Sequence, residues 1–513
     1  MGRVVVIGAG LGGLSVAARL GTMGHRVTVC EQAPEVGGKL ATYSRDGFTF
    51  DTGPSLLTLP AVYRDLFIKT GSPIETALEI VPVDPTCRYR FADGTWLDVP
   101  NASRTKIAQA FDEGLGNGAG QDWNRFMDRA GRIWQATRGP FLESPLDGLG
   151  GLARRSRNIG DLRTIAPWQT LRGLGRHYLR DPRLRAYLDR YATYTGSDPR
   201  RTPAALAVVP YVEQTFGSWY VTGGLRRLGE AVRDRALERK VEIRTSAEVT
   251  AVLTDAGRAN GVRLAGGEQI AADIVVANAD AHHLYTDLVS APKALARLRR
   301  ATPSLAGFVL LLALRGRTPH AASRAHHTVL FPEHYDDEFD AIFSRPARPV
   351  PDPTVYISAP DDPALRPDAD SEAWFVLVNA PRHQAGGRGR DHRGRDHRGT
   401  GWATDGVDWD APGLAQAYAD RIVGLLASRG MDVRDRVRWR EIRTPADLER
   451  ATRAPGGSIY GTSSNGARAA FLRPANRSPV PGLFLVGGSA HPGGGLPLVG
   501  LSAAIVADLI GPA

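Results

Sequence analysis

The sequence predicts an α/β fold in which a parallel, nucleotide-binding sheet is assembled from distant parts of the chain. An apolar strand at 4–7 leads directly into a glycine-rich turn and a helix at 14–20. A second strand at 26–30 follows, which completes the βαβ unit with which doubly wound sheets begin. Near the other end, an apolar strand at 483–486 leads into another glycine-rich loop and a helix at 498–510.

The middle of the chain adds further elements to this frame. Residues 76–219 have Arg- and Leu-rich helical patterns, which predict a separate lobe. After about residue 220 the sequence predicts a helix that ends near 238. Short strands are then expected at 241–244, 249–253, 261–264 and 274–278. Residues 291–470 alternate strands and helices, and the apolar run 306–314 predicts a buried strand because it is half the length of a membrane-spanning helix.

Length and composition describe a globular protein with more than one lobe. The chain has 513 residues, of which 42% are hydrophobic and 23% charged, and this length exceeds one ordinary core. The net charge of +10 comes almost wholly from arginine, since there are only five lysines. A basic surface attracts anionic lipid or nucleic acid, and we expect lipid and no nucleic acid.

The cysteines and the start of the chain predict where the protein works. Cys30 and Cys87 are too few for a disulfide framework, and their spacing is not that of metal ligands, so a reducing cytoplasm is expected. The apolar residues 4–7 continue into glycines instead of a cleavage site, so no signal peptide is expected. We therefore expect a cytoplasmic protein that binds the inner face of the cell membrane only peripherally.

The first glycine-rich turn has the pattern Gly8-x-Gly10-x-x-Gly13, whose glycines bring a pyrophosphate close to a helix N-terminus. The spacing alone is weak, because 58 glycines in 513 residues produce roughly one such pattern by chance. Its context is specific: an acid, Glu31, stands at the end of the second strand, where it accepts hydrogen bonds from ribose hydroxyls. These features predict a bound dinucleotide without a ribose 2′-phosphate, either FAD or NAD.

Residues 5–39 resemble the dinucleotide segment of the flavoproteins that include amine oxidases, protoporphyrinogen oxidase and carotene desaturases. In that group Gly-Gly-Arg/Lys follows the ribose acid, as Gly37-Gly38-Lys39 does in this chain. The resemblance implies FAD as the cofactor, with Lys39 near its phosphates. It also implies that the loop Asp51-Thr52-Gly53-Pro54-Ser55 approaches the flavin.

The segment at 481–499, PGLFLVGGSAHPGGGLPLV, resembles the signature that ends bacterial-type FAD-dependent carotenoid (phytoene) desaturases. A strand delivers glycines to the start of a helix, whose N-terminus favours negative charge on a reduced flavin ring. Many flavoproteins of the group carry an acid after the glycine of this strand, whereas this chain has Gly488 and Ser489, and the carotenoid desaturases also lack that acid. Residues 457–461 and 471–474 look closest to hydroxycarotenoid 3,4-desaturases and diapophytoene-type desaturases.

The resemblance implies a Rossmann-type FAD-binding domain of the amine oxidase and protoporphyrinogen oxidase kind, with an inserted mixed α+β lobe that binds substrate and membrane. We expect a discontinuous FAD-binding domain at 1–75, 220–290 and 471–513. Residues 76–219 should form a helical, membrane-associating substrate lobe. Residues 291–470 should form a substrate-binding lobe, with a flexible insert at 382–399. The residues expected to contact FAD are Gly8, Gly10, Leu11, Gly12, Gly13, Glu31, Gly38, Lys39, Gly53, Pro54, Ser55, Val249, Gly487, Gly488, Leu496, Pro497 and Leu498.

The same resemblance implies the reaction. The enzyme would introduce C=C bonds into a long apolar polyene, an acyclic carotenoid such as phytoene or a later, hydroxylated intermediate, by hydride transfer to flavin N5, with oxygen or a quinone as electron acceptor. No catalytic side chain and no metal is predicted, because the cofactor carries the chemistry. The histidines of 382–399 lie among arginines, and His326-His327 is typical of packing groups.

Three alternatives stay open at this point. A flavin amine oxidase acting on a small amine shares the first glycine motif, although the missing acid at Gly488-Ser489 speaks against it. A flavin-binding scaffold would bind the cofactor without turnover. A nucleic-acid binder that uses its arginines would retain only a vestigial flavin fold.

Overall fold

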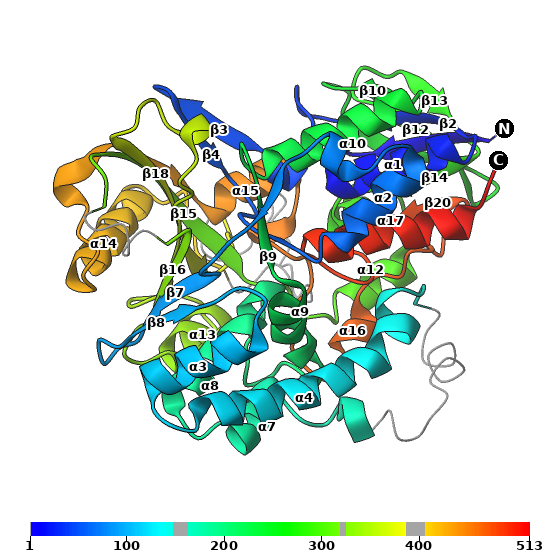
Figure 1. Cartoon of the computed structure of the whole chain (residues 1–513). Coiled ribbons are helices and arrows are strands. Elements are labelled where there is room, and N and C mark those ends of the chain that lie inside the picture. Colours follow the sequence, from blue (N-terminus) through cyan, green and yellow to red (C-terminus); the bar gives the residue numbers. More distant parts are fainter. Residues whose placement is uncertain (1, 147–162, 319–324, 386–405) are drawn as a thin grey trace.

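The computed structural model describes residues 2–146, 163–318, 325–385 and 406–513, which fold around two large sheets (Figure 1). A five-stranded sheet has the order β10-β2-β1-β14-β20, and a seven-stranded sheet has the order β19-β15-β18-β17-β16-β7-β8. The first sheet lies beside both chain termini at the right of Figure 1, and the second lies at the left. A layer of helices, α3, α4, α7, α8 and α9, runs beneath them in this view.

The five-stranded sheet is parallel throughout and joins the two ends of the chain. Its strands in spatial order are β10 (Glu242–Arg244), β2 (Arg26–Cys30), β1 (Arg3–Ile7), β14 (Ile274–Ala277) and β20 (Leu483–Leu485). The βαβ unit expected at the start of the chain is therefore confirmed. The helix α1 (Leu11–Thr22) begins three residues before the predicted position, because Gly12 and Gly13 belong to its first turn.

Both faces of this sheet are buried, as the continuous apolar runs of its strands predict. Val4 and Val6 of β1 face helices, whereas Val5 and Ile7 face the opposite cluster. The helices on the first side are α1, α2 (Ala61–Thr70), α10 (Arg226–Glu238) and α17 (Leu496–Ile510). The second side is covered by a small antiparallel sheet and by the turns and helix after β14, namely β11 (Val249–Asp255), β12 (Arg258–Leu264), β13 (Gln269–Ala271), α11 (Ala281–His283), η6 (Leu284–Leu288) and α12 (Pro292–Leu298).

The seven-stranded sheet is built around β15 (Ala306–Arg315), the strand that the longest apolar run predicts. Phe308, Leu310 and Leu312 pack on one face, and Val309 and Leu311 pack on the other. The remaining strands are β19 (Val437–Arg443), β18 (Ser371–Ala380), β17 (Val355–Ser358), β16 (His327–Leu330), β7 (Cys87–Arg90) and β8 (Trp96–Val99). The helix α14 (Leu414–Ser428) covers the first face, and the hairpin of β3 (Thr42–Arg45) and β4 (Phe48–Asp51) lies against the second.

The helical layer packs on the β7–β16 end of this sheet. Its helices are α3 (Arg104–Leu115), α4 (Ala119–Thr137), α7 (Leu171–Tyr178), α8 (Pro182–Arg190) and α9 (Val208–Phe216), and the 3-10 turn η4 (Tyr191–Thr195) follows α8. A short sheet of β5 (Leu57–Thr58), β9 (Ser218–Val221) and β6 (Ile80–Pro82) links this layer to the first sheet. The smaller helices outside it are α13 (Asp336–Phe343), α15 (Pro445–Thr452) and α16 (Ala469–Leu472).

The structure differs from the expected division at residues 76–219. This segment is not helical throughout, because β7 and β8 form a hairpin and β7 pairs in parallel with β16, which extends the sheet of 291–470. Cys87 and Tyr89 alternate inward with Arg88 and Arg90 outward, a strand pattern too short to stand out in an arginine-rich sequence. The other expected boundaries stay predictions, and most of the insert expected at 382–399 lies outside the described residues.

Membrane crossing was not expected from the sequence. Among the helices that the structure describes, none is both long enough and apolar enough to cross a membrane.

The central strand β15 makes a testable contribution to stability. Phe308 is fully buried, with its ring centroid 5.3 Å from that of Trp409 and 4.9 Å from that of Tyr418. We expect Phe308→Ala to lower the free energy of unfolding by about 3–5 kcal/mol, because it deletes a buried ring and leaves a cavity. The control Phe216→Ala, at a ring 38% exposed, should cost about 1 kcal/mol or less. Urea unfolding followed by tryptophan fluorescence measures both, and equal losses would contradict this packing.

Candidate functional site

The turn between β1 and α1 has the backbone of an anion-binding site. Gly8 has a φ of +92°, which favours glycine, and a Cβ at Gly13 would lie only 2.1 Å from the carbonyl oxygen of Gly8. The helix therefore packs directly onto the turn. Gly10 caps α1 without a side chain, which leaves the first backbone N–H groups of the helix free for a phosphate.

Asn278, which directly follows β14, joins this turn to the C-terminal loop. Its Nδ2 donates a hydrogen bond to the carbonyl of Gly8 at 3.4 Å. A Cβ would lie 2.8 Å from Nδ2 if added at Gly10, and 2.7 Å or 2.5 Å from Oδ1 if added at Gly12 or Gly487. The glycines are thus required by this amide as well as by any ligand. Asn278 was not among the site residues predicted from the sequence, although its place at the carboxyl end of a central strand is a signal that could have found it.

Glu31 lies at the same edge of the sheet as the glycine turn, as predicted. One carboxylate oxygen accepts from the backbone N–H of Ala9 at 2.7 Å, and the other accepts from Ala33 at 2.9 Å. Two carboxylate oxygens offer about four acceptor positions, so the group can still accept from ribose hydroxyls. Val249 begins β11 and is buried in the same apolar cluster as Ile7 and Cys30, so its contact with the cofactor stays a prediction.

The predicted loops after β2 and β4 meet beside this turn. Gly37 donates its N–H to the carbonyl of Ala9, and a Cβ at Gly38 would lie 3.2 Å from the Cα of Gly10. A Cβ at Gly53 would lie 1.8 Å from the carbonyl oxygen of Lys39, so the loop that contains Pro54 and Ser55 packs on the first loop without space for a side chain.

The ammonium group of Lys39 points toward a third loop. Its Nζ donates to the carbonyls of Ile459, at 2.5 Å, and Ser458, at 3.4 Å. Burial lowers the pKa of Lys39, and the negative charge of Asp280 opposes this shift. The expected position near the FAD phosphates stays a prediction.

The C-terminal loop presents a second open helix N-terminus. Gly487, Gly493 and Gly495 all have positive φ, and Gly495 caps α17 without a side chain. Leu496, Pro497 and Leu498 form the first turn of α17, and the carbonyl of Leu496 accepts from the hydroxyl of Tyr63 at 2.6 Å. The chain therefore brings the Gly487–Leu498 segment to the turn at Gly8–Gly13 through contacts at Asn278 and between Gly12 and Gly487.

Arg473 holds this second loop in place through hydrogen bonds to backbone carbonyls. Its buried guanidinium donates to the carbonyls of Gly488, Tyr460 and Thr462. Burial lowers the pKa of Arg473 to about 10, so the group stays cationic at neutral pH. In the sequence, Arg473 is only one residue of the family pattern at 471–474, because its contacts depend on tertiary structure.

These residues fit a flavin dinucleotide. Two helix N-termini lack side-chain caps, glycines leave their approaches free of Cβ atoms, and a carboxylate stands where a ribose is expected. The pyrophosphate of FAD matches the first loop and its flavin matches the second, and these two loops are far apart in sequence but close together in space. The Gly488 side of the site carries positive charge from Arg473, which suits the anionic side of a reduced flavin.

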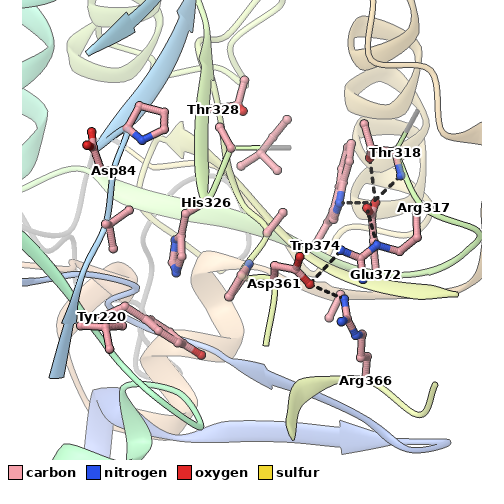
Figure 2. Close-up of a pocket in the computed structure, with 18 of the residues that line it drawn as sticks. Asp84, Tyr220, Arg317, Thr318, His326, Thr328, Asp361, Arg366, Glu372 and Trp374 are labelled. Carbon is pink, nitrogen blue, oxygen red and sulfur yellow. Dashed lines mark hydrogen bonds and ion pairs between the residues drawn. The ribbon is translucent and has the colours of Figure 1, made fainter. Parts of the chain in front are cut away.

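A separate pocket of about 320 Å³ lies against the seven-stranded sheet (Figure 2). Asp361 pairs with Arg317 at 2.8 Å and with Arg366 at 2.7 Å, and in Figure 2 this cluster lies across the pocket from His326 and Tyr220. None of the predicted cofactor residues lines it. Burial lowers the pKa of His326 to about 4, so its imidazole is neutral at pH 7 and suits a packing group better than a general acid.

Two other features weighed in the sequence have structural explanations. Cys30 and Cys87 are buried free thiols, and burial raises their pKa values to about 11 and about 12, which makes them unreactive. His383 lies with Asp408 and Asp410 so that one ligand atom of each lies within 4.8 Å of the others. His383 also accepts from the backbone N–H of Trp409, so it serves in packing this turn.

Comparison with known proteins places the chain among flavoenzymes. Residues 11–366 match the family described as flavin containing amine oxidoreductase. The chain is 34% identical to the 4,4'-diapolycopene oxygenase of Methylomonas sp., over 99% of this chain and 98% of that protein. It is also 34% identical to the hydroxyneurosporene desaturase of Rubrivivax gelatinosus, over 99% of this chain and 93% of that protein.

Solved structures share the fold at low sequence identity. A putrescine oxidase bound to putrescine aligns with a TM-score of 0.65 at 13% identity, over 99% of each chain. The cyclohexylamine oxidase of Brevibacterium oxydans IH-35A aligns with a TM-score of 0.60 at 15% identity, also over 99% of each chain. The α/β flavoprotein fold is therefore confirmed.

The glycine turn yields a prediction about cofactor retention. Gly13→Ala places a Cβ against the carbonyl of Gly8, so the turn must shift, and we expect the purified protein to lose most of its bound FAD. The matched control is Gly266→Ala, at a glycine with open space around it. Release of flavin by heat and its absorbance per mole of protein measure retention. Full retention in Gly13→Ala would contradict this placement of the cofactor.

Proposed function

We propose that this protein introduces C=C bonds into an acyclic carotenoid. The chain belongs to the flavin-containing amine oxidoreductases and, within them, to the bacterial-type carotenoid desaturases. The observation that carries the proposal is full-length similarity to proteins named for action on long polyenes, combined with two glycine loops that converge at Asn278. FAD, when bound, supplies the acceptor for a hydride taken from a saturated carbon.

The residues of this chain bind and orient rather than carry the redox chemistry. The N-terminus of α1 would hold the pyrophosphate of FAD, the N-terminus of α17 would lie on the flavin side, and Glu31 would hold a ribose. Arg473 positions the loop at Gly488 through its carbonyl. The proton that leaves the substrate passes to water or a weak base, since the charge left on a polyene spreads over an allylic system and needs little local stabilisation.

The substrate side of the site is aromatic. Tyr194, Tyr356 and Tyr460 each keep part of their surface accessible, and burial in protein raises the pKa of each phenol. Such rings suit the flat, apolar surface of a polyene and exclude water from it. Tyr356 is connected to the predicted flavin loop, because its hydroxyl lies 2.5 Å from the Oγ of Ser55.

Peripheral membrane binding is part of the proposal. A long polyene resides in the bilayer, so the enzyme must reach it there. Trp168, just before α7, is 72% exposed, and tryptophan is favoured at membrane interfaces. The excess of arginine supports attraction to anionic lipid, and we propose oxygen or a quinone as the final electron acceptor.

Amine oxidation is less well supported. The putrescine oxidase likeness is one of fold alone, whereas the full-length relatives above 30% identity carry the names of carotenoid desaturases and oxygenases. The acid that many relatives carry after the strand glycine is replaced by Gly488 and Ser489 in this chain.

Expression in bacteria that accumulate phytoene, and in parallel a hydroxylated acyclic carotenoid, tests the proposed function. We expect pigment absorption to shift to longer wavelength in at least one strain, because each new double bond extends the conjugated system. Strains that express the Gly13→Ala variant are the control and should show little shift. Purified protein with bound FAD and unchanged pigments in both strains would contradict carotenoid desaturation.

A further inference from the structure

Arg190, the last residue of α8, is a buried cation whose guanidinium has no hydrogen-bonding partner among the residues that the structure describes. Arg190 is only 7% exposed. The guanidinium makes no hydrogen bond and no ion pair with any residue that the structure describes, and its Nε is fully buried. It lies instead over two rings, with Cζ 5.2 Å from the centroid of Tyr194 and 5.3 Å from that of Tyr356.

The other buried arginines of this chain have acceptors. Arg473 donates to three carbonyls, and Arg429 pairs with Asp352 and donates to the carbonyls of Leu330 and Pro353. Arg235 donates to two carbonyls and pairs with Glu238. Burying a guanidinium without acceptors is unfavourable, and two cation–π contacts offset only part of that cost. Arg190 therefore has unpaired donors that a bound molecule could satisfy.

The nearby acid does not serve as this acceptor. The carboxylate of Glu213 accepts from the hydroxyl of Tyr191 at 2.6 Å, and that hydroxyl lies 2.9 Å from the hydroxyl of Tyr187. Gln214 donates to Tyr187 in turn. Glu213 therefore forms its hydrogen bonds within a network of neutral groups. Among the interactions of the described residues, no ion pair joins it to Arg190.

Arg190 lies on the side of the site where a substrate would bind. Tyr356, beneath the guanidinium, contacts Ser55 of the predicted flavin loop. The positive charge of Arg190 also acts on Tyr460, whose ring fills the space where Gly494 would carry a Cβ. Tyr194 and Tyr356 are each only partly buried. The guanidinium therefore lies over two tyrosine rings, one of which contacts the predicted flavin loop.

We propose that Arg190 is a specificity-determining residue that donates hydrogen bonds to an oxygen atom of the substrate, so that the enzyme prefers an oxygenated acyclic polyene to the hydrocarbon. The proposal rests on the proposed function. Guanidinium groups carry five donors and no acceptor, and a hydrocarbon offers them no acceptor, whereas a hydroxyl or carbonyl oxygen does. A site built to bond an oxygen rejects the analogue that lacks it, because its own donors are then left unpaired.

Equilibrium binding tests this assignment without turnover. Two fully conjugated acyclic carotenoids, one a hydrocarbon and one with a terminal hydroxyl, cannot be desaturated further and are presented to the holoenzyme from the same vesicles. The shift of their absorption bands on binding yields each Kd. We expect the wild type to bind the hydroxylated pigment about 10- to 100-fold more tightly, and Arg190→Met to bind both alike. A pigment ending in an aldehyde distinguishes a carbonyl from a hydroxyl as the favoured oxygen.

The controls separate recognition from stability. Arg190→Lys keeps the charge without the planar fork and should lose part of the preference, which keeps the test valid if the methionine variant fails to fold. Arg235→Met removes an equally buried arginine that also lies over a ring, that of Phe67, and should leave the ratio of the two Kd values unchanged. No preference in the wild type, or equal weakening of both pigments by Arg190→Met, would overturn the proposal. Selective binding without turnover of any carotenoid would contradict the proposed function and still support the role of Arg190.

Discussion

The close approach of two glycine loops around the Asn278 amide is the constraint on which the rest of the structure depends. Gly10, Gly12 and Gly487 lie so close to this amide that a Cβ at any of the three would clash with it, so none of these positions admits a larger residue without movement. The approach requires that β1, β14 and β20 be neighbours in one parallel sheet, and this order brings the two ends of the chain together. Other segments between the two ends build the second sheet and the helical layer.

Two cations, Lys39 and Arg473, lie near this meeting point without an ion pair to any acid that the structure describes. Lys39 and Arg473 donate to backbone carbonyls, and Asp280 is the acid whose charge acts on both. Arg190 adds a third cation, which lies over the rings of Tyr194 and Tyr356. In a low-dielectric interior such groups favour negative charge on whatever lies between them, which suits a cofactor that gains electrons. The same charges disfavour a cationic amine as substrate, a physical reason for the divergence from amine oxidases that share the fold.

Sequence patterns predicted those parts of the fold that depend on local periodicity. The apolar runs at β1 and β15 and the glycine turn after β1 were recognisable because a buried strand and a phosphate-binding turn each impose a local pattern. β7 and β8 were missed because four-residue strands rich in arginine have no distinctive period, and a distant strand decides their pairing. Asn278 was missed although its place after a central strand was a signal for it, whereas Arg190 could not be assigned because its significance lies in the absence of acceptors among the described residues around it.

The central claim is that a carotenoid gives its hydride directly to a flavin held between these two loops. Anaerobic mixing of the purified holoenzyme with an oxygenated acyclic carotenoid measures this most directly, with the flavin and polyene absorption followed in the same sample. The account predicts that the oxidised flavin bleaches at the same rate as the polyene band moves to longer wavelength. A flavin that stays oxidised while the polyene is bound would contradict it.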